Sequence, residues 1–368
     1  MTPFRHLYLH IPFCRHKCGY CDFNAYAGMQ AVIPSYCDAL LEELRVARER
    51  FPFEPLRTVY LGGGTPSLLS PEQLSRLMSG VRELFVVQRD AEVTLEANPA
   101  STDDARLAAW RAAGVNRLSI GVQGFDPVAL AVLERRTDGR QAVGAFRLAR
   151  AAGFDNISVD LIYAVPGQTE ESWRQTVRRA IELGPDHFSC YCLSFEEGTL
   201  LHRRRAAGLV GELDADAQWR LLELATAELT RAGYERYEVS SWARPGSESR
   251  HNGAYWECRP VYGAGAGAHT YATDGELAWR WWNVARPRAY VAAVPDVRMD
   301  GEELTPRQAA AERLMLGLRR TSGLAVPDGF ESELAELEAA GLVERHQGSA
   351  RPSRRGLDLH NQIALALL

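Results

Sequence analysis

Short apolar segments typical of β-strands alternate with amphipathic helical segments along about the first two thirds of the chain. A series of β/α units connects parallel strands, so the sequence predicts a parallel sheet that is either doubly wound or rolled into a barrel. The spacing of apolar residues does not distinguish a doubly wound sheet from a barrel. In both, the loops that carry chemistry follow the carboxyl ends of the strands. The six predicted strands lie at residues 7–11, 59–61, 93–96, 118–121, 157–161 and 188–193.

Local signals also mark helices and a change of architecture. Ser70, Pro71 and Gln73 supply an N-cap, an N1 proline and a capping-box partner, so a helix is expected to begin there. After about residue 236 the alternation stops, and residues 240–300 are rich in Gly, Pro and aromatic side chains. A small α+β region follows, with predicted helices from Thr305 to about residue 319, at residues 331–340 and up to Leu368, and a hairpin at residues 343–352.

Composition narrows the class of protein. The 368 residues carry a net charge of −5, and 46% are hydrophobic, as in an ordinary globular protein. This charge gives no indication of a nucleic-acid partner. No apolar run reaches the roughly 18–20 residues that span a bilayer, and the N-terminus lacks a signal-peptide pattern. We therefore expect a cytoplasmic protein, where clustered cysteines indicate metal binding rather than disulfides.

Three of the seven cysteines, Cys14, Cys18 and Cys21, lie within eight positions. A structural zinc site normally has four Cys or His ligands, and His16 is poorly placed on a tight loop to be the fourth, although zinc stays an alternative. An iron–sulfur cubane explains the spacing better, because thiolates bind its iron corners. Three ligands leave one iron free. Position 23, two residues after the third cysteine, is Phe23.

A second motif, residues 62–66 (GGGTP), follows a predicted strand but lacks the Lys of a phosphate-binding P-loop. It is either a plain glycine turn or a place where a ligand approaches the backbone closely.

The pattern Cys14-x3-Cys18-x2-Cys21, with Tyr20 before the last cysteine, resembles the radical S-adenosylmethionine (SAM) superfamily. The resemblance implies an α/β fold, a partial (β/α)6 TIM-like barrel with a small C-terminal winged-helix-like α+β domain. It also implies a 4Fe–4S cluster held by these three cysteines, whose free iron binds the amino and carboxylate groups of SAM. The glycine motif resembles the superfamily segment that holds the methionine part of SAM.

Residues 8–14, YLHIPFC, extend the resemblance to the oxygen-independent coproporphyrinogen III oxidase-like family, over essentially the whole chain. Carboxylates at predicted strand ends suit an ammonium or ribose hydroxyls, and a guanidinium suits the SAM carboxylate. Taken singly, Glu96 or Asp160 is better explained as a helix N-cap or a surface ion pair, and only the set of residues together favours a ligand site. The resemblance implies SAM contacts for Tyr8, Tyr20, Gly63, Gly64, Thr65, Glu96, Gln123, Arg135, Asp160 and Ser194.

Two features resemble the heme chaperone (HemW) branch of that family. The oxidase branch has a fourth cysteine where this chain has Phe23, which argues against porphyrinogen decarboxylation. Residues 251–256, HNGAYW, resemble the HNxxYW motif linked to heme in the chaperones. Imidazole is a common heme-iron ligand, so His251 is the heme candidate, and His269 of GAGAGAH is a weaker one. A hydrogen-bonded structural histidine is the alternative for His251.

The resemblance therefore implies a heme chaperone without catalytic turnover that binds heme, the cluster and SAM and transfers heme to apo-hemoproteins. An oxidase of coproporphyrinogen III is the alternative, and RNA modification fits poorly with an acidic chain. A homodimer and membrane contact through clients are further expectations. The implied domains are a core barrel (residues 1–235), an extension with the HNxxYW motif (236–300) and a C-terminal domain (301–368).

Overall fold

A computed structural model describes residues 1–367, which are built around one twelve-stranded sheet. All six predicted strands are present and pair in parallel in sequential order, as in a barrel rather than a doubly wound sheet. The two edge strands of the sheet, β14 and β9, do not pair with each other, so the barrel is open. The six strands are β1 (Phe4–Ile11), β4 (Phe53–Gly63), β5 (Val87–Ala97), β6 (Arg117–Gln123), β7 (Ile157–Tyr163) and β8 (His187–Cys192).

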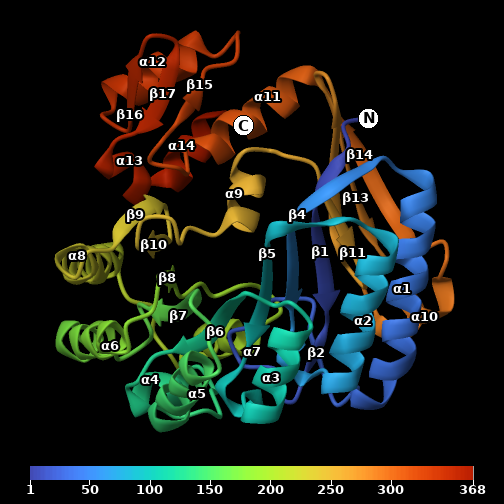
Figure 1. Cartoon of the computed structure of the whole chain (residues 1–368). Coiled ribbons are helices and arrows are strands. Elements are labelled where there is room, and N and C mark those ends of the chain that lie inside the picture. Colours follow the sequence, from blue (N-terminus) through green and yellow to red (C-terminus); the bar gives the residue numbers. More distant parts are fainter. Residues whose placement is uncertain (368) are drawn as a thin grey trace.

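Helices connect the parallel strands and cover the outside of the sheet, as α1, α2 and α3 do beside β1, β4 and β5 (Figure 1). The predicted capping box is confirmed: the Gln73 amide donates to Ser70 Oγ, and the Gln73 side chain accepts from the Ser70 amide. The helices are α1 (Ile33–Arg50), α2 (Pro71–Leu84), α3 (Asp104–Ala112), α4 (Pro127–Val132), α5 (Gly139–Ala151), α6 (Glu170–Glu182), α7 (Leu200–Ala206) and α8 (Ala215–Arg231), with 3-10 turns at Gln30–Val32, Pro66–Leu68 and Pro99–Ser101.

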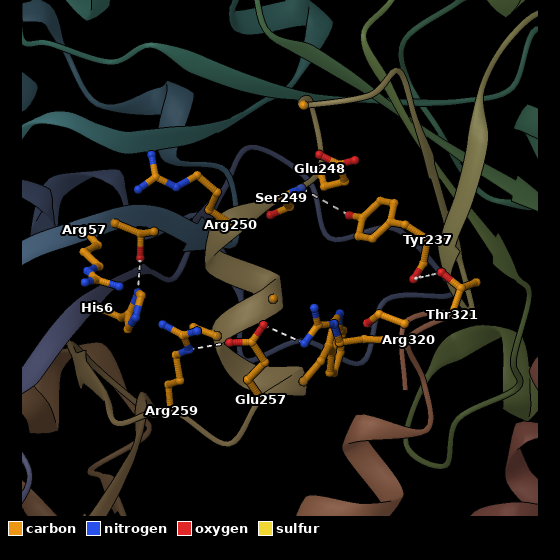
Figure 2. Close-up of a pocket in the computed structure, with 16 residues that line it drawn as sticks. His6, Arg57, Tyr237, Glu248, Ser249, Arg250, Glu257, Arg259, Arg320 and Thr321 are labelled. Atoms are coloured by element: carbon orange, nitrogen blue, oxygen red, sulfur yellow. Dashed lines mark hydrogen bonds and ion pairs between the residues drawn. The ribbon is translucent and has the colours of Figure 1, made fainter. Parts of the chain in front are cut away.

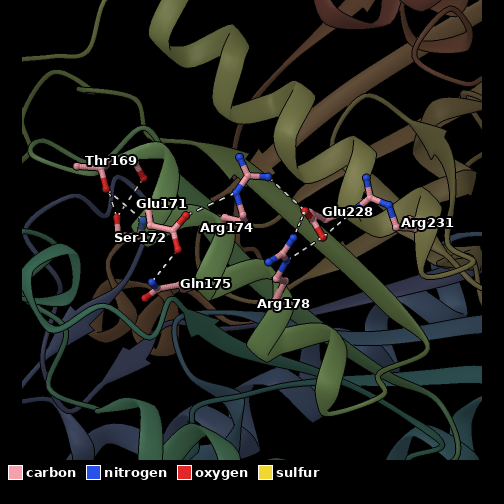
Figure 3. Close-up of polar contacts among 8 residues, drawn as sticks. All are labelled: Thr169, Glu171, Ser172, Arg174, Gln175, Arg178, Glu228 and Arg231. Atoms are coloured by element: carbon pink, nitrogen blue, oxygen red, sulfur yellow. Dashed lines mark hydrogen bonds and ion pairs between the residues drawn. The ribbon is translucent and has the colours of Figure 1, made fainter.

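Helices α6 and α8 are joined by an ion cluster around Glu228 (Figure 3). Its carboxylate lies 3.0 Å from Arg178, 3.1 Å from Arg231 and 3.3 Å from Arg174. Arg178 and Arg231 lower the pKa of Glu228, with the hydrogen bond from Arg178 as the largest cause. Beneath the cluster, the buried Trp173 indole donates to the Leu221 carbonyl at 2.9 Å. The cluster thus belongs to the scaffold rather than to a cavity.

The segment after residue 235 extends the same sheet at both edges, which the sequence did not predict. Strand β11 (Val261–Ala264) pairs in parallel with β1, and β10 (Ser241–Ala243) pairs antiparallel with β8. Between them, α9 (Arg250–Trp256) carries the HNxxYW motif. The other elements here are β9 (Glu235–Glu238), β12 (His269–Asp274), β13 (Leu277–Asn283), α10 (Pro287–Ala293) and β14 (Arg298–Leu304), and the short pair β2 (Phe13–Cys14) and β3 (Tyr26–Ala27) precedes α1.

The C-terminal part, residues 306–367, has its own small core and a three-stranded antiparallel sheet. The predicted hairpin is confirmed. The C-terminal part lies beside α9, against which α11 packs (Figure 1). A buried ion pair, Arg236–Asp358 at 2.5 Å, ties it to the barrel. Its elements are α11 (Pro306–Gly317), β15 (Leu324–Ala325), α12 (Glu331–Ala339), β16 (Val343–His346), β17 (Ser349–Pro352), α13 (Arg354–Asp358) and α14 (His360–Leu367). The predicted helix end at Leu368 lies outside the described residues.

Among residues 1–367, no helix is both long and apolar enough to cross a membrane.

Candidate functional site

A cavity of about 490 Å³ lies at the carboxyl ends of the parallel strands, where the sequence placed the chemistry. All three motif cysteines line it. Cys14 Sγ lies 3.3 Å from Thr65 Oγ1, and the Cys21 amide donates to the Cys18 carbonyl at 3.1 Å. The thiols form no disulfide, and within residues 1–367 no three Cys, His, Asp or Glu side chains form a site for a single metal ion. Three separate free thiols facing one cavity fit the donor set of a cluster with three thiolate ligands.

The glycine motif closes one wall of this cavity through its backbone. Gly63 has φ +109°, and a Cβ there would meet the His10 ring at 2.5 Å. A Cβ on Gly64 would meet the Phe13 backbone nitrogen at 2.8 Å. The glycines are therefore required by packing against the end of β1, whatever ligand their other side meets. A larger residue at Gly63 would strike His10 instead of simply filling the cavity.

Two carboxylates face the cavity from β5 and β7, the strands on either side of β6. Glu96, at the end of β5, accepts hydrogen bonds from the Tyr60 hydroxyl at 2.9 Å and the Gly63 amide at 3.0 Å. Burial raises the pKa of Glu96 to about 7. Asp160 of β7 accepts from Ser119 Oγ at 2.9 Å, and burial also raises its pKa. These oxygens are held in place for a cationic or hydroxyl-bearing ligand.

Arg135 lies beside the cysteine loop, with Nη1 3.8 Å from Cys18 Sγ and Nη2 donating to the Gly121 carbonyl. Gln123 reaches the cavity from a backbone with φ 68°, which is rare for a residue with a side chain. Together with these two, the structure places most SAM-contact candidates on the cavity wall: Tyr20, Gly63, Gly64, Thr65, Glu96, Asp160 and Ser194.

Tyr8 does not line this cavity, but it packs on Tyr60, which does. Its backbone pairs with Tyr60, and its ring packs against the stacked rings of Tyr60 and His251, with centroids 6.1 Å and 6.3 Å away. Its hydroxyl lies 3.0 Å from His10 Nδ1.

Sequence reasoning missed Arg117, Tyr191 and Asn252, which also line the cavity. Arg117 is 2% exposed, and no ion-pair partner for it exists within residues 1–367. Its position in β6 could have indicated that it faces the cavity. Residues two apart on a strand point to the same side, and Ser119 and Gly121 also line the cavity.

His251 is enclosed between the barrel and α9, with 1% of its surface exposed. Its Nδ1 lies 2.7 Å from Thr58 Oγ1, and its ring stacks on Tyr60 at 5.0 Å. Its Nε2 is buried without a hydrogen-bond partner within residues 1–367. Burial, followed by the charge of His6, lowers the pKa of His251 to about 3, so the imidazole is neutral. His269, by contrast, is exposed on β12 next to Trp282.

A second cavity, of about 540 Å³, lies at the opposite end of the barrel, where α9 meets the C-terminal part (Figure 2). His6 reaches it from the start of β1 and Arg57 from the first half of β4. Gly253, Ala254 and Trp256 of the HNxxYW helix form part of its wall. Helix α9 therefore borders both cavities, because Asn252 lines the first one.

Comparisons with known proteins decide the family. The model of the Radical SAM superfamily matches residues 8–180. The heme chaperone HemW of Mycobacterium tuberculosis is 40% identical over 98% of this chain and 94% of its own length. HemW of Bacillus subtilis is 32% identical, with 98% of each chain covered. The chain belongs to the HemW family of the radical SAM superfamily. The predicted family is thus confirmed, and membership implies a 4Fe–4S cluster and SAM.

The fold of this HemW family member is also found in a solved structure. Coproporphyrinogen III oxidase (HemN) of Escherichia coli, a radical SAM enzyme, matches with a TM-score of 0.84 and 26% identity, over 99% of this chain and 90% of that one. The predicted α/β barrel with a small C-terminal domain is confirmed by this likeness.

Proposed function

We propose that this protein is a heme chaperone, which binds heme and passes it to apo-hemoproteins. The observation that carries the proposal is the identity of 32–40% to proteins named heme chaperones, over nearly the whole of both chains. Phe23, where the oxidase branch has a cysteine, supports it. Phe23 is 60% exposed and sits on the rim of the first cavity, where it offers iron no ligand atom.

The first cavity is proposed to hold the cluster and SAM. Cys14, Cys18 and Cys21 would bind three irons, and a SAM-bound reduced cluster supplies an electron for cleavage of the sulfonium. The residues of the chain position the cofactor: Glu96 would accept a hydrogen bond from the SAM ammonium, and Arg135 would pair with its carboxylate. Gly63, Gly64 and Thr65 would meet the methionine part, and further contacts would come from Tyr20, Gln123, Asp160 and Ser194. Tyr8 would support this wall from behind by packing on Tyr60.

The HNxxYW helix is proposed to serve heme. His251 is neutral and has an unpartnered ring nitrogen, which is the chemistry of an iron ligand or of a group that positions one. Because His251→Ala removes this imidazole, we expect the substitution to weaken heme binding. Exposed His269 is the second candidate.

The proposal includes the domain limits 1–235, 236–300 and 301–368, apo-hemoprotein clients, a homodimer, contact with membranes through clients, and a cytoplasmic location. A reducing compartment would keep the cluster thiols free.

The test uses cluster-loaded protein with SAM. It should bind ferric heme with a shifted absorbance band and transfer it to apomyoglobin on a size-exclusion column. Absence of heme binding would contradict the chaperone function. Oxidation of coproporphyrinogen III is the second candidate, because the fold matches HemN over 99% of the chain. With a reductant present, coproporphyrinogen III should stay unchanged, whereas steady formation of protoporphyrinogen would favour the oxidase.

A further inference from the structure

The second cavity carries a set of ligand and cationic side chains that no sequence motif predicted. They are His6, Arg57, Arg250, Arg259 and Arg320. Its volume of about 540 Å³ falls in the range of about 300–1,000 Å³ that is typical of small-molecule sites. We propose that it is the heme pocket, with His6 Nε2 as the iron ligand and the arginines as partners of the heme carboxylates. This inference rests on the proposed heme chaperone function and names where and how heme is held.

His6 has the arrangement of an oriented ligand. It is 5% exposed, lines the cavity and makes one side-chain hydrogen bond, from Nδ1 to Thr58 Oγ1 at 2.9 Å. Figure 2 shows this bond and the ring beside α9. Burial, followed by the charge of Arg259, lowers the pKa of His6 to about 4, so the ring is neutral at pH 7. A neutral imidazole with one nitrogen fixed by a hydrogen bond presents the other as a metal ligand.

The Thr58 hydroxyl explains how buried His251 contributes. Thr58 is fully buried, and its Oγ1 lies 2.9 Å from His6 Nδ1 and 2.7 Å from His251 Nδ1. A hydroxyl donates one proton, so it donates to one ring and accepts from the other. When His6 Nε2 offers its lone pair to iron, His6 carries its proton on Nδ1 and donates it to Thr58. Thr58 then donates to His251. In this arrangement His251 is a positioning residue and His6 the ligand.

The charge of the cavity wall suits an anion. Four arginines and two glutamates line it, a difference of 4 − 2 = 2 positive charges. Glu257 is already paired with Arg259 and, at 2.5 Å, with Arg320. Arg57 forms no ion pair within residues 1–367. Trp256 and Ala254 give the same wall an apolar part. Heme combines an apolar ring with two carboxylates, which matches this wall.

The first test is a titration of the full-length, cluster-loaded protein with ferric heme. His6→Ala should lower heme affinity by at least about 10-fold and remove the absorbance signature of imidazole ligation, which added imidazole should restore. His6→Gln, which can still bond Thr58, should lose the signature too. Thr58→Val should lower affinity by about 10- to 100-fold while histidine ligation persists, as for other partners of metal-bound histidines. Exposed His346→Ala is the matched control.

Circular dichroism and thermal melting establish that each variant is folded. Wild-type affinity and spectrum in both His6 variants would overturn the inference and leave the chaperone function standing, with His251 and His269 tested next. If the wild-type protein does not bind heme, the proposed function itself fails.

The second test addresses the carboxylates. Wild-type protein should bind heme more tightly than heme dimethyl ester, and Arg57→Gln should lower affinity for free heme alone, by about two- to fivefold. Exposed Arg288→Gln should leave both affinities unchanged. Equal affinity of the wild type for heme and its ester would overturn the role of the arginines.

Discussion

The two cavities occupy opposite ends of one open barrel and differ in how the sequence builds them. The first is formed by loops that directly follow parallel strands, and its thiols lie within eight positions of the chain. The second combines the starts of β1 and β4 with α9 and the C-terminal part, so His6 and Arg320 meet across more than 300 residues. A site made of consecutive strand ends can be recognised from motifs, whereas a site closed by distant segments requires the fold.

The largest expected effect is the loss of the cluster from the first cavity. Replacing Cys14, Cys18 and Cys21 together with Ala should abolish the brown cluster chromophore after anaerobic reconstitution, because no thiolate remains at the site. Iron and sulfide analysis checks this. Replacing Cys37, Cys190 and Cys258 together provides a control with the same number of thiols removed. Full iron retention in the motif variant would contradict the assignment of the cluster.

The next prediction concerns SAM binding by Glu96 in the first cavity. Glu96→Gln should weaken SAM binding by about 10- to 100-fold, because a charged hydrogen bond to the ammonium is lost. A carboxyl group with a pKa of about 7 is largely protonated below that pH. Only the ionised form attracts a cation, so wild-type affinity should rise as the pH increases from about 6 to about 8. Calorimetry should show this rise and a flatter profile for Glu96→Gln. Identical profiles would remove Glu96 from the SAM site.

A smaller effect is expected at Gly63. Gly63→Ala forces a side chain into a positive-φ conformation and against the His10 ring, so we expect a loss of about 1–3 kcal/mol of unfolding free energy. Gly144→Ala, in the middle of α5 with open space around it, should instead stabilise by about 0.5–1 kcal/mol. Denaturant unfolding measures both. Equal stability of the two variants would mean that the glycine motif is not held by packing.

Particular residues show why the sequence could predict which side chains gather at one end of the barrel. The strand ends gather Glu96, Gln123 and Asp160 into one cavity because parallel strands share a carboxyl edge. The capping box at Ser70 depends on three neighbouring residues and was equally visible. Tyr8 was assigned to SAM by resemblance, and the structure places it behind the cavity wall, packed on Tyr60, which lines the cavity.

The other end was not predictable because its contacts are tertiary. No sequence pattern indicated that β11 would pair with β1, or that the Glu92 carboxylate would accept hydrogen bonds from the amides of Arg250 and His251. Those contacts hold α9 against the barrel and create the second cavity. Arg117 was missed for a related reason, since an arginine at the start of a strand is usually exposed.

The separation of the two sites is tested most directly by titrating heme into two proteins, the wild type and the variant with Cys14, Cys18 and Cys21 replaced by Ala. Heme held by His6 beneath α9 does not use the cluster thiols. The account therefore predicts the same absorbance spectrum and affinities equal within about twofold, with the variant still folded by circular dichroism. Loss of heme binding together with the cluster would contradict a heme site at the opposite end of the barrel.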